Sequence, residues 1–190
     1  MREFIYFSKK ARTSGAFKEL MSAGRLDIAC HVIIMTFFVS NAIRKNVKLH
    51  LFFYGPPDPP KHLEIMNPEI ISKKDISGLI KRMLYKYKKN KKNEALPGCW
   101  IEKKSFQGFV EELSEQDRNI YLLDPKGEDI RKVEIDKNSV FIFGDHEGIP
   151  KQELRRIKNK VKKISIGNIA YFSSQVIAIV QNELDRRGID

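Results

Sequence analysis

Three glycine-containing loops in the last third of the chain are the first candidates for binding chemistry. They read LLDPKG from Leu122, FGDHEGIP from Phe143 and SIGNIAYFSS from Ser165. Each follows a short apolar stretch typical of a buried strand. Glycine lets the backbone approach a ligand closely. For any one of these glycines taken alone, however, a role in a turn is the better explanation. Their joint position predicts a shared ligand pocket if the three strands are parallel.

Motifs of several common enzyme classes are absent. The chain has no GxGxxG string, no Walker loop and no G-x-S-x-G elbow, which argues against dinucleotide-binding, nucleotide triphosphatase and hydrolase functions. His146 and Glu147 lack the second histidine of a zinc helix, and the four histidines are dispersed along the chain. We therefore expect no metal site and a plain loop role for Glu147.

The elements that must position the loops alternate between strands and helices. Apolar runs predict strands at 3–7, 47–54, 62–66, 99–101, 119–123, 140–143 and 161–166. Helical spacing predicts helices at 25–44, 76–84, 106–113, 150–158 and 171–187. The residues 55–60 (GPPDPP) are expected to form an irregular loop and residues 124–127 a turn. This order predicts an α/β fold with a mostly parallel sheet flanked by helices, whose ligands bind beyond the carboxyl ends of the strands.

Composition and charge indicate a folded domain with a polyanionic partner. The 190 residues are 42% hydrophobic and 31% charged, which fits one domain spanning 1–190. The net charge of +11 favours RNA, DNA or an anionic membrane surface. The basic run at 86–92 (KYKKNKK) is explained equally well by a solvated loop.

Cysteine content and hydropathy address the compartment. Cys30 and Cys99 form neither a disulfide framework nor a paired zinc motif, which fits a reducing cytoplasm. The start of the chain lacks the apolar stretch of a signal peptide, and the longest apolar run, 32–39, is too short to cross a bilayer. We expect no membrane partner.

Beyond these patterns, the chain resembles a known family along nearly its whole length. The string FIFGDHEGIP, a basic helix and ISIGNIAYFSSQVIAIVQNELDRR look like the C-terminal signature of the SPOUT methyltransferases. AGRLDIACHVI, with the later string SNAIRKNVKLHLFFYGPPDPP, is similar to the opening helix and proline-rich loop of the TrmY branch. GRLD together with PPDPP makes TrmY a better match than other SPOUT enzymes.

The resemblance implies a fold and a reaction that the residue patterns alone do not show. It implies that the last three strand-end loops form a deep trefoil knot that holds a bent S-adenosylmethionine (SAM). It also implies a homodimer that methylates N1 of pseudouridine at position 54 in the T-loop of tRNA. The expected partner is therefore the T-arm of tRNA, not DNA.

Particular residues match family positions that hold the cofactor. Leu123 and Gly144 match cofactor contacts, and the stretch that wraps the cofactor matches Ile166, Gly167, Asn168, Ile169, Ala170 and Tyr171. Val176 stands at a cofactor-site position that is commonly cysteine, and Asn168-Ile169 replace the usual proline-lysine. Contacts in this loop should be made largely by the backbone, so these departures need not abolish binding.

Two charged residues match catalytic positions at the start of the first helix. Asp27 is the candidate that accepts the proton of the acceptor nitrogen or orients the base, and Arg25 is the candidate contact to phosphate or base. Stabilisation of the helix start explains Asp27 equally well.

Two alternatives remain at this stage. One is a SPOUT methyltransferase that acts on pseudouridine in ribosomal RNA. The other is a non-catalytic RNA-binding assembly protein that keeps the fold, an alternative to which the departures at Val176 and Asn168 give some weight.

Overall fold

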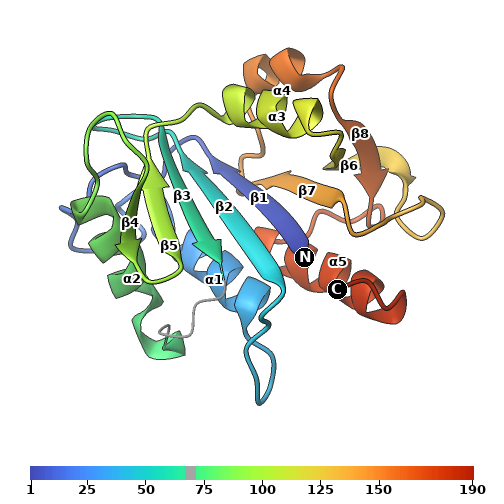
Figure 1. The fold of residues 1–190 in the computed structure, drawn as a ribbon, viewed down its shortest axis with the longest axis horizontal. Coiled ribbons are helices and arrows are strands. Elements are labelled where there is room, and N and C mark those ends of the chain that lie inside the picture. The colour runs from blue at the N-terminus through green and yellow to red at the C-terminus, as the bar shows by residue number, and fades with distance from the viewer. Residues whose placement is uncertain (67–71) are drawn as a thin grey trace.

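The structure, a computed structural model, describes residues 1–66 and 72–190. One eight-stranded sheet runs through the molecule in the order β4-β5-β3-β2-β1-β7-β6-β8 (Figure 1). The strands are β1 (Arg2–Ser8), β2 (Val47–Phe53), β3 (Lys61–Met66), β4 (Asn93–Leu96), β5 (Cys99–Glu102), β6 (Asn119–Asp129), β7 (Ser139–Gly144) and β8 (Lys162–Ser165). The helices are α1 (Leu26–Phe37), η1 (Lys73–Asp75, a 3-10 turn), α2 (Ile76–Tyr85), α3 (Phe106–Glu115), α4 (Lys151–Ile157) and α5 (Ser173–Arg186).

The sheet has a parallel part and an antiparallel part. Strands β2, β1, β7, β6 and β8 are parallel neighbours, whereas β3, β5 and β4 pair in antiparallel fashion beyond β2. The predicted α/β fold with a mostly parallel sheet is confirmed. Because the parallel strands share one direction, the loops after β6, β7 and β8 leave the sheet at the same edge.

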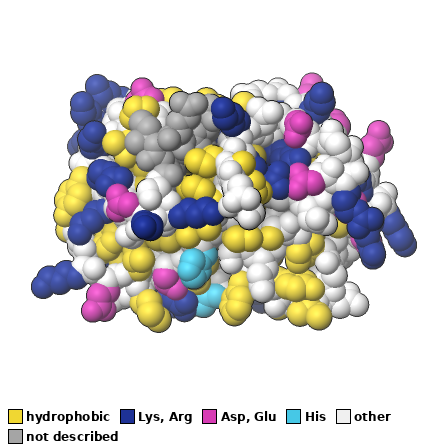
Figure 2. Space-filling view, turned by 90° about the horizontal axis from the view of Figure 1, so that it is seen from below, with side chains coloured by type: hydrophobic (Ala, Val, Ile, Leu, Met, Phe, Trp, Pro, Cys, Tyr) yellow, Lys and Arg dark blue, Asp and Glu magenta, His cyan; other side chains and the backbone are white. Residues whose placement is uncertain are grey.

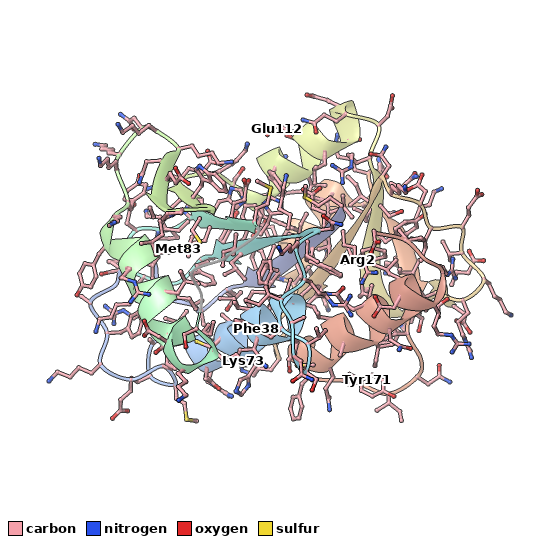
Figure 3. The ribbon with its side chains drawn as sticks, turned by 60° about the horizontal axis from the view of Figure 1, so that its bottom comes forward. Arg2, Phe38, Lys73, Met83, Glu112 and Tyr171 are labelled. Carbon is pink, nitrogen blue, oxygen red and sulfur yellow. The ribbon has the colours of Figure 1, made fainter. Side chains whose placement is uncertain are left out.

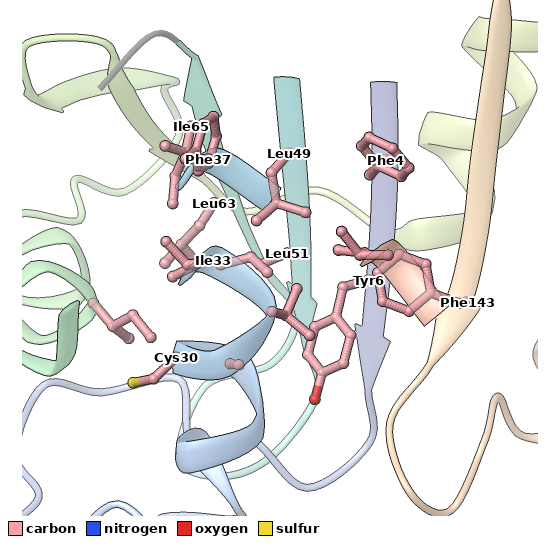
Figure 4. Packing of buried hydrophobic residues seen from close by; sticks show 14 of the residues in the cluster. Phe4, Tyr6, Cys30, Ile33, Phe37, Leu49, Leu51, Leu63, Ile65 and Phe143 are labelled. Atoms are coloured by element: carbon pink, nitrogen blue, oxygen red, sulfur yellow. The ribbon is translucent and has the colours of Figure 1, made fainter. Parts of the chain in front are cut away.

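Side chains alternate between the two faces of the sheet, as the period of a strand requires. Phe4 and Tyr6 of β1 pack in a core with α1, α2 and α5 (Figure 4). Ile5 and Phe7 pack on the opposite face under α3 and α4. The sheet is therefore covered by helices on both faces (Figure 1), which explains why its central strands read as continuous apolar runs.

Helix α1 ends earlier than its sequence pattern predicts. The prediction extended it to Arg44, but Phe38 adopts an extended conformation and bridges to Ile43 in a short turn. Leaving the helix lets the Arg44 guanidinium reach Asp185 of α5, at 2.8 and 2.6 Å. None of the helices in the described ranges is long and apolar enough to cross a bilayer.

The turn predicted at 124–127 is instead part of strand β6. The pairing of β6 with β8 shifts register between Leu123 and Glu128 and then continues to Asp129. A Cβ added to Gly127 would lie 2.5 Å from the backbone of Ile164. The turn-forming residues therefore make an irregularity within a ladder, because pairing with β8 resumes after them.

Strand β4 was not predicted, because its sequence, NEAL, is short and polar. It lies at the edge of the sheet and pairs only with β5 among the described strands. A short polar edge strand carries little of the apolar pattern on which strand prediction depends.

Candidate active site

A cavity of about 360 Å³ lies at the sheet edge where β6, β7 and the segment after β8 meet. The three predicted segments do converge at one cavity, although the first of them is an irregular part of strand β6 and not a loop after a strand. The lining includes every predicted cofactor residue except the exposed Asn168. The lining residues are Leu123, Asp124, Pro125, Phe143, Gly144, Asp145, His146, Glu147, Gly148, Ile166, Gly167, Ile169, Ala170, Tyr171, Ser173 and Val176.

Gly144 is required by the path of its own loop. A Cβ at this position would lie 2.6 Å from the carbonyl carbon of Gly148, closer than side chains approach backbone. The loop folds back because the Gly148 amide donates to the Asp145 carbonyl at 2.9 Å, and Gly148 has a φ of +71°. Both glycines therefore serve the turn, and the turn shapes one wall of the cavity.

Asp145 is a buried carboxylate in the cavity wall that the sequence analysis did not single out. Ser8 of β1 donates its hydroxyl to Asp145 Oδ2 at 2.7 Å, and the Glu147 amide donates to Oδ1 at 2.9 Å. Its place directly after the strand-end Gly144 was the available signal. The neighbouring Glu147 forms an ion pair with Lys10 at the surface.

The segment between β8 and α5 closes another side of the cavity. Gly167 has a φ of +133°, and its amide donates to Ser165 Oγ at 3.1 Å. The Ser173 hydroxyl donates to the carbonyl oxygen of Gly144 at 2.8 Å, which fixes the start of α5 against the end of β7. Tyr171 lies on the face that α1 and α5 form (Figure 3).

Arg25 and Asp27 form a two-point ion pair at the start of α1. Arg25 Nε and Nη2 donate to the two carboxylate oxygens of Asp27 at 3.0 and 2.9 Å. Arg25 has a φ of 62°, a left-handed conformation rare for a side-chain-bearing residue, so the local backbone is held there at some cost in energy. The hydrogen bond from Arg25 is the main cause that lowers the pKa of Asp27. Asp27 is therefore a carboxylate at neutral pH, suited to accepting a hydrogen bond.

A second cavity of about 670 Å³ is lined by this ion pair and lies next to the first cavity. Both cavities are lined by Tyr171 and Ser173, and also by His146 and Ala170. His31, one helical turn after Asp27, lines the second cavity as well. It escaped the sequence analysis, although its spacing of four residues from Asp27 placed both on one helix face.

Comparison with known proteins identifies the family. The model of a family described as "Putative SAM-dependent RNA methyltransferase" matches residues 1–189. The chain belongs to this family. The resemblance to the TrmY branch is confirmed by relatives that carry the name tRNA (pseudouridine(54)-N(1))-methyltransferase. The relative from Pyrococcus abyssi is 36% identical over 204 residues and is covered completely, as is this chain. The relative from Methanocaldococcus jannaschii is 34% identical, with 100% of this chain and 98% of the relative covered.

The fold of this RNA methyltransferase agrees with a solved structure. Archaeoglobus fulgidus Nep1, crystallised with S-adenosylhomocysteine, superposes with a TM-score of 0.63 at 12% identity and covers 97% of each chain. At this identity the likeness concerns the fold alone.

The cavity of the methyltransferase suits SAM, the cofactor of its family. Leu123, Phe143 and Val176 supply apolar surface, as an adenine ring requires. A Cβ on Gly167 would meet no atom within 4 Å, so that side of the loop is open to a ligand. Asp145 lies in the same wall with its side chain 1% exposed, and it holds the loop through Ser8 and the Glu147 amide.

Proposed function

We propose that this chain transfers a methyl group from SAM to ring nitrogen N1 of pseudouridine at position 54 in the T-loop of tRNA. The observation that carries the proposal is that the two cavities are neighbours with shared lining residues. One holds the predicted cofactor residues, the other holds Arg25 and Asp27, and Tyr171 and Ser173 line both. A base bound beside Asp27 would thus lie next to the donor. The relatives named above carry the same activity in their names.

Proximity accounts for much of the chemistry in this arrangement. The sulfonium of SAM supplies a methyl group already activated for transfer. The protein must hold N1 in line with it and accept the proton that N1 loses when the new carbon–nitrogen bond forms. Asp27, ionised and partly exposed, accepts this proton or the hydrogen bond of the N1–H group.

Arg25 has two tasks in this proposal. Its guanidinium orients Asp27 through two hydrogen bonds. Its side chain is 39% exposed, so it also reaches a phosphate or base of the bound RNA. The net charge of +11 supports binding of the tRNA T-arm in preference to a neutral partner.

We also propose that the protein is a homodimer whose interface lies beside the cavities. Ile169 and Phe172 are 66% and 73% exposed, and Tyr171 between them is 39% exposed. Hydrophobic side chains gather on the face that carries α1 and α5, next to Lys and Arg (Figure 2). Exposed apolar clusters of this kind mark interaction sites. Phe172→Asp should shift the protein to a monomer in sedimentation, whereas Tyr85→Asp on the distant α2 should not.

Three further parts of the proposal concern the whole chain. Residues 1–190 form one domain, since a single sheet takes strands from both halves. The last loops form a trefoil knot; the return of residues 166–172 from the edge strand β8 to Gly144 of β7 supports this. The protein works in the cytoplasm, in keeping with a tRNA substrate and with the free, buried thiols of Cys30 and Cys99.

The test is single-turnover transfer of labelled methyl from SAM to two T-loop RNAs that differ only in uridine or pseudouridine at position 54. Label on the pseudouridine RNA alone is expected. Label on neither RNA, with RNA binding intact, would contradict the proposal and favour a ribosomal substrate or a non-catalytic role.

A further inference from the structure

Two of the four histidines meet on the sheet face covered by α3, away from both cavities. His50 Nδ1 of β2 and His62 Nε2 of β3 are 2.8 Å apart, and each residue is 1% exposed. Phe52 stacks on His62 with ring centroids 4.5 Å apart, and the Phe109 ring lies 4.5 Å from His50. The pair is therefore enclosed by aromatic rings.

On each histidine, the ring nitrogen that points away from the other ring, here called the outer nitrogen, contacts a carboxylate. His50 Nε2 lies 2.8 Å from Glu3 Oε1, and His62 Nδ1 lies 3.0 Å from Glu102 Oε1. Arg118 donates to the other oxygen of Glu3 at 2.6 Å. Carboxylates in this position orient metal-binding imidazoles and direct their free nitrogens toward the ion.

The count of hydrogen-bond donors and acceptors leaves no hydrogen between the two facing nitrogens of the rings. Ionised Glu3 and Glu102 only accept hydrogen bonds, so the outer nitrogens of His50 and His62 both carry hydrogen. Two neutral rings would then face each other through lone pairs at 2.8 Å. Such a contact needs an additional proton or a cation between the nitrogens.

A third ligand atom lies within reach. Glu64 is two residues after His62 on the same strand face, and its Oε2 lies 3.7 Å from His50 Nδ1. One ligand atom from each of the three residues lies within 4.8 Å of the others. Two imidazole nitrogens and a carboxylate oxygen are a donor set that zinc takes in sites with three protein ligands, where a water molecule is the fourth ligand.

Charge is compatible with a cation at this position. Three carboxylates, Glu3, Glu64 and Glu102, surround the two histidines. Arg118 pairs with Glu3 from a position that is 18% exposed, and Lys92 pairs with Glu64 from a position that is 41% exposed. A positive ion bound between the rings would therefore lie next to carboxylates, which favour it.

We propose that His50, His62 and Glu64 form a buried site for a divalent transition metal of the zinc class. Zinc–nitrogen bonds of about 2.0–2.1 Å place tetrahedral ligand nitrogens roughly 3.3 Å apart, so the rings separate by about 0.5 Å on binding. Glu3 and Glu102 belong to β1 and β5, and the ion therefore links four neighbouring strands. Its role is structural, and it does not depend on the methyl transfer reaction.

The experiment uses the full-length protein, stripped with a chelator and titrated with Zn²⁺ or Co²⁺. We expect uptake of about one ion per chain and a rise of several degrees in Tm. The Co²⁺ form should show tetrahedral absorption bands and two solvent-protected, paramagnetically shifted imidazole N–H signals, one from the Nε2–H of His50 and one from the Nδ1–H of His62. Failure of both ions to bind would overturn the proposal.

Variants locate the site. His62→Gln should abolish uptake, whereas His31→Gln and His146→Gln, which alter the two remaining histidines, should retain it. Glu64→Gln is the milder variant, because it leaves the buried histidine pair in place and should not prevent folding. It should weaken Zn²⁺ affinity by at least about 10-fold. Unchanged Zn²⁺ affinity of a folded Glu64→Gln protein, or unchanged uptake by a folded His62→Gln protein, would place the ion elsewhere and overturn the assignment.

Discussion

The guanidinium of Arg25 contacts both carboxylate oxygens of Asp27, with Nε–Oδ1 and Nη2–Oδ2 distances of 3.0 and 2.9 Å. The contact spans only two residues and depends on the left-handed conformation of Arg25. It aligns a carboxylate at the mouth of the cavity that adjoins the cofactor loops.

Asp27→Asn should lower the single-turnover rate of methyl transfer by about 100-fold or more, the range expected for loss of a positioned proton acceptor. SAM affinity should change little, because Asp27 does not line the cavity that holds the predicted cofactor residues. Rapid-quench kinetics and equilibrium cofactor binding separate the two effects. Wild-type rates in the variant would remove Asp27 from the mechanism.

Arg25→Gln should move the acid limb of the rate–pH profile to higher pH. The hydrogen bond from Arg25 is the largest cause that lowers the pKa of Asp27, and burial acts in the opposite direction. Without the guanidinium the pKa of Asp27 rises, so Asp27 is protonated, and can no longer accept a proton, at a higher pH. Arg25→Lys keeps the charge and should shift the limb less. Superimposable profiles for the three proteins would show that Asp27 does not govern the limb.

Ser8→Ala should lower the free energy of unfolding by about 1–3 kcal/mol, because it leaves an oxygen of the buried Asp145 without its donor. SAM affinity should fall as well, since Asp145 lines the cofactor cavity. Urea denaturation and calorimetric titration measure the two quantities. Ser22→Ala, which changes an exposed serine, is the control. A stability equal to that of the control would contradict the role given to Ser8.

Gly144→Ala should destabilise the protein by about 1–3 kcal/mol and weaken SAM binding together, because the new Cβ would lie 2.6 Å from Gly148 backbone. Gly108→Ala is a matched control on helix α3, where the nearest atom to the added Cβ is Ser105 Oγ at 3.0 Å. Thermal melts with and without SAM compare the two variants. Intact cofactor binding in Gly144→Ala would show that the loop tolerates displacement.

Asp185→Asn should reduce stability near neutral pH by roughly 0.5 kcal/mol, because solvent screens the ion pairs of a side chain that is 39% exposed. The variant should also lose less stability in acid than the wild type does. The hydrogen bond from Arg44 is the largest cause that lowers the pKa of Asp185, and Arg2 adds to it. A carboxylate with a lowered folded-state pKa stabilises the protein above its unfolded pKa. This contribution disappears as pH falls through the folded pKa. Denaturation between roughly pH 2 and 7 measures the difference, and parallel curves for variant and wild type would contradict it.

Local patterns and family motifs made much of this molecule predictable. Apolar runs located β1, β2 and β7 because a strand buried on both faces must be hydrophobic throughout. The strings around Gly144 and Gly167 indicated which loops line the candidate cofactor cavity. The boundaries failed where tertiary contacts outweighed local pattern, as at the end of α1 and in the continuation of β6.

The sequence by itself determined the α/β class, the family and the loops that carry the candidate site. Only the tertiary structure decided which distant side chains meet. Ser8 reaches Asp145 because β1 pairs with β7, and His50 reaches His62 because β2 and β3 pair with one particular register. Periodicity is a property of neighbouring residues and is therefore readable along the chain. Strand order and register arise from burial of the whole sheet, and no local stretch of sequence contains them.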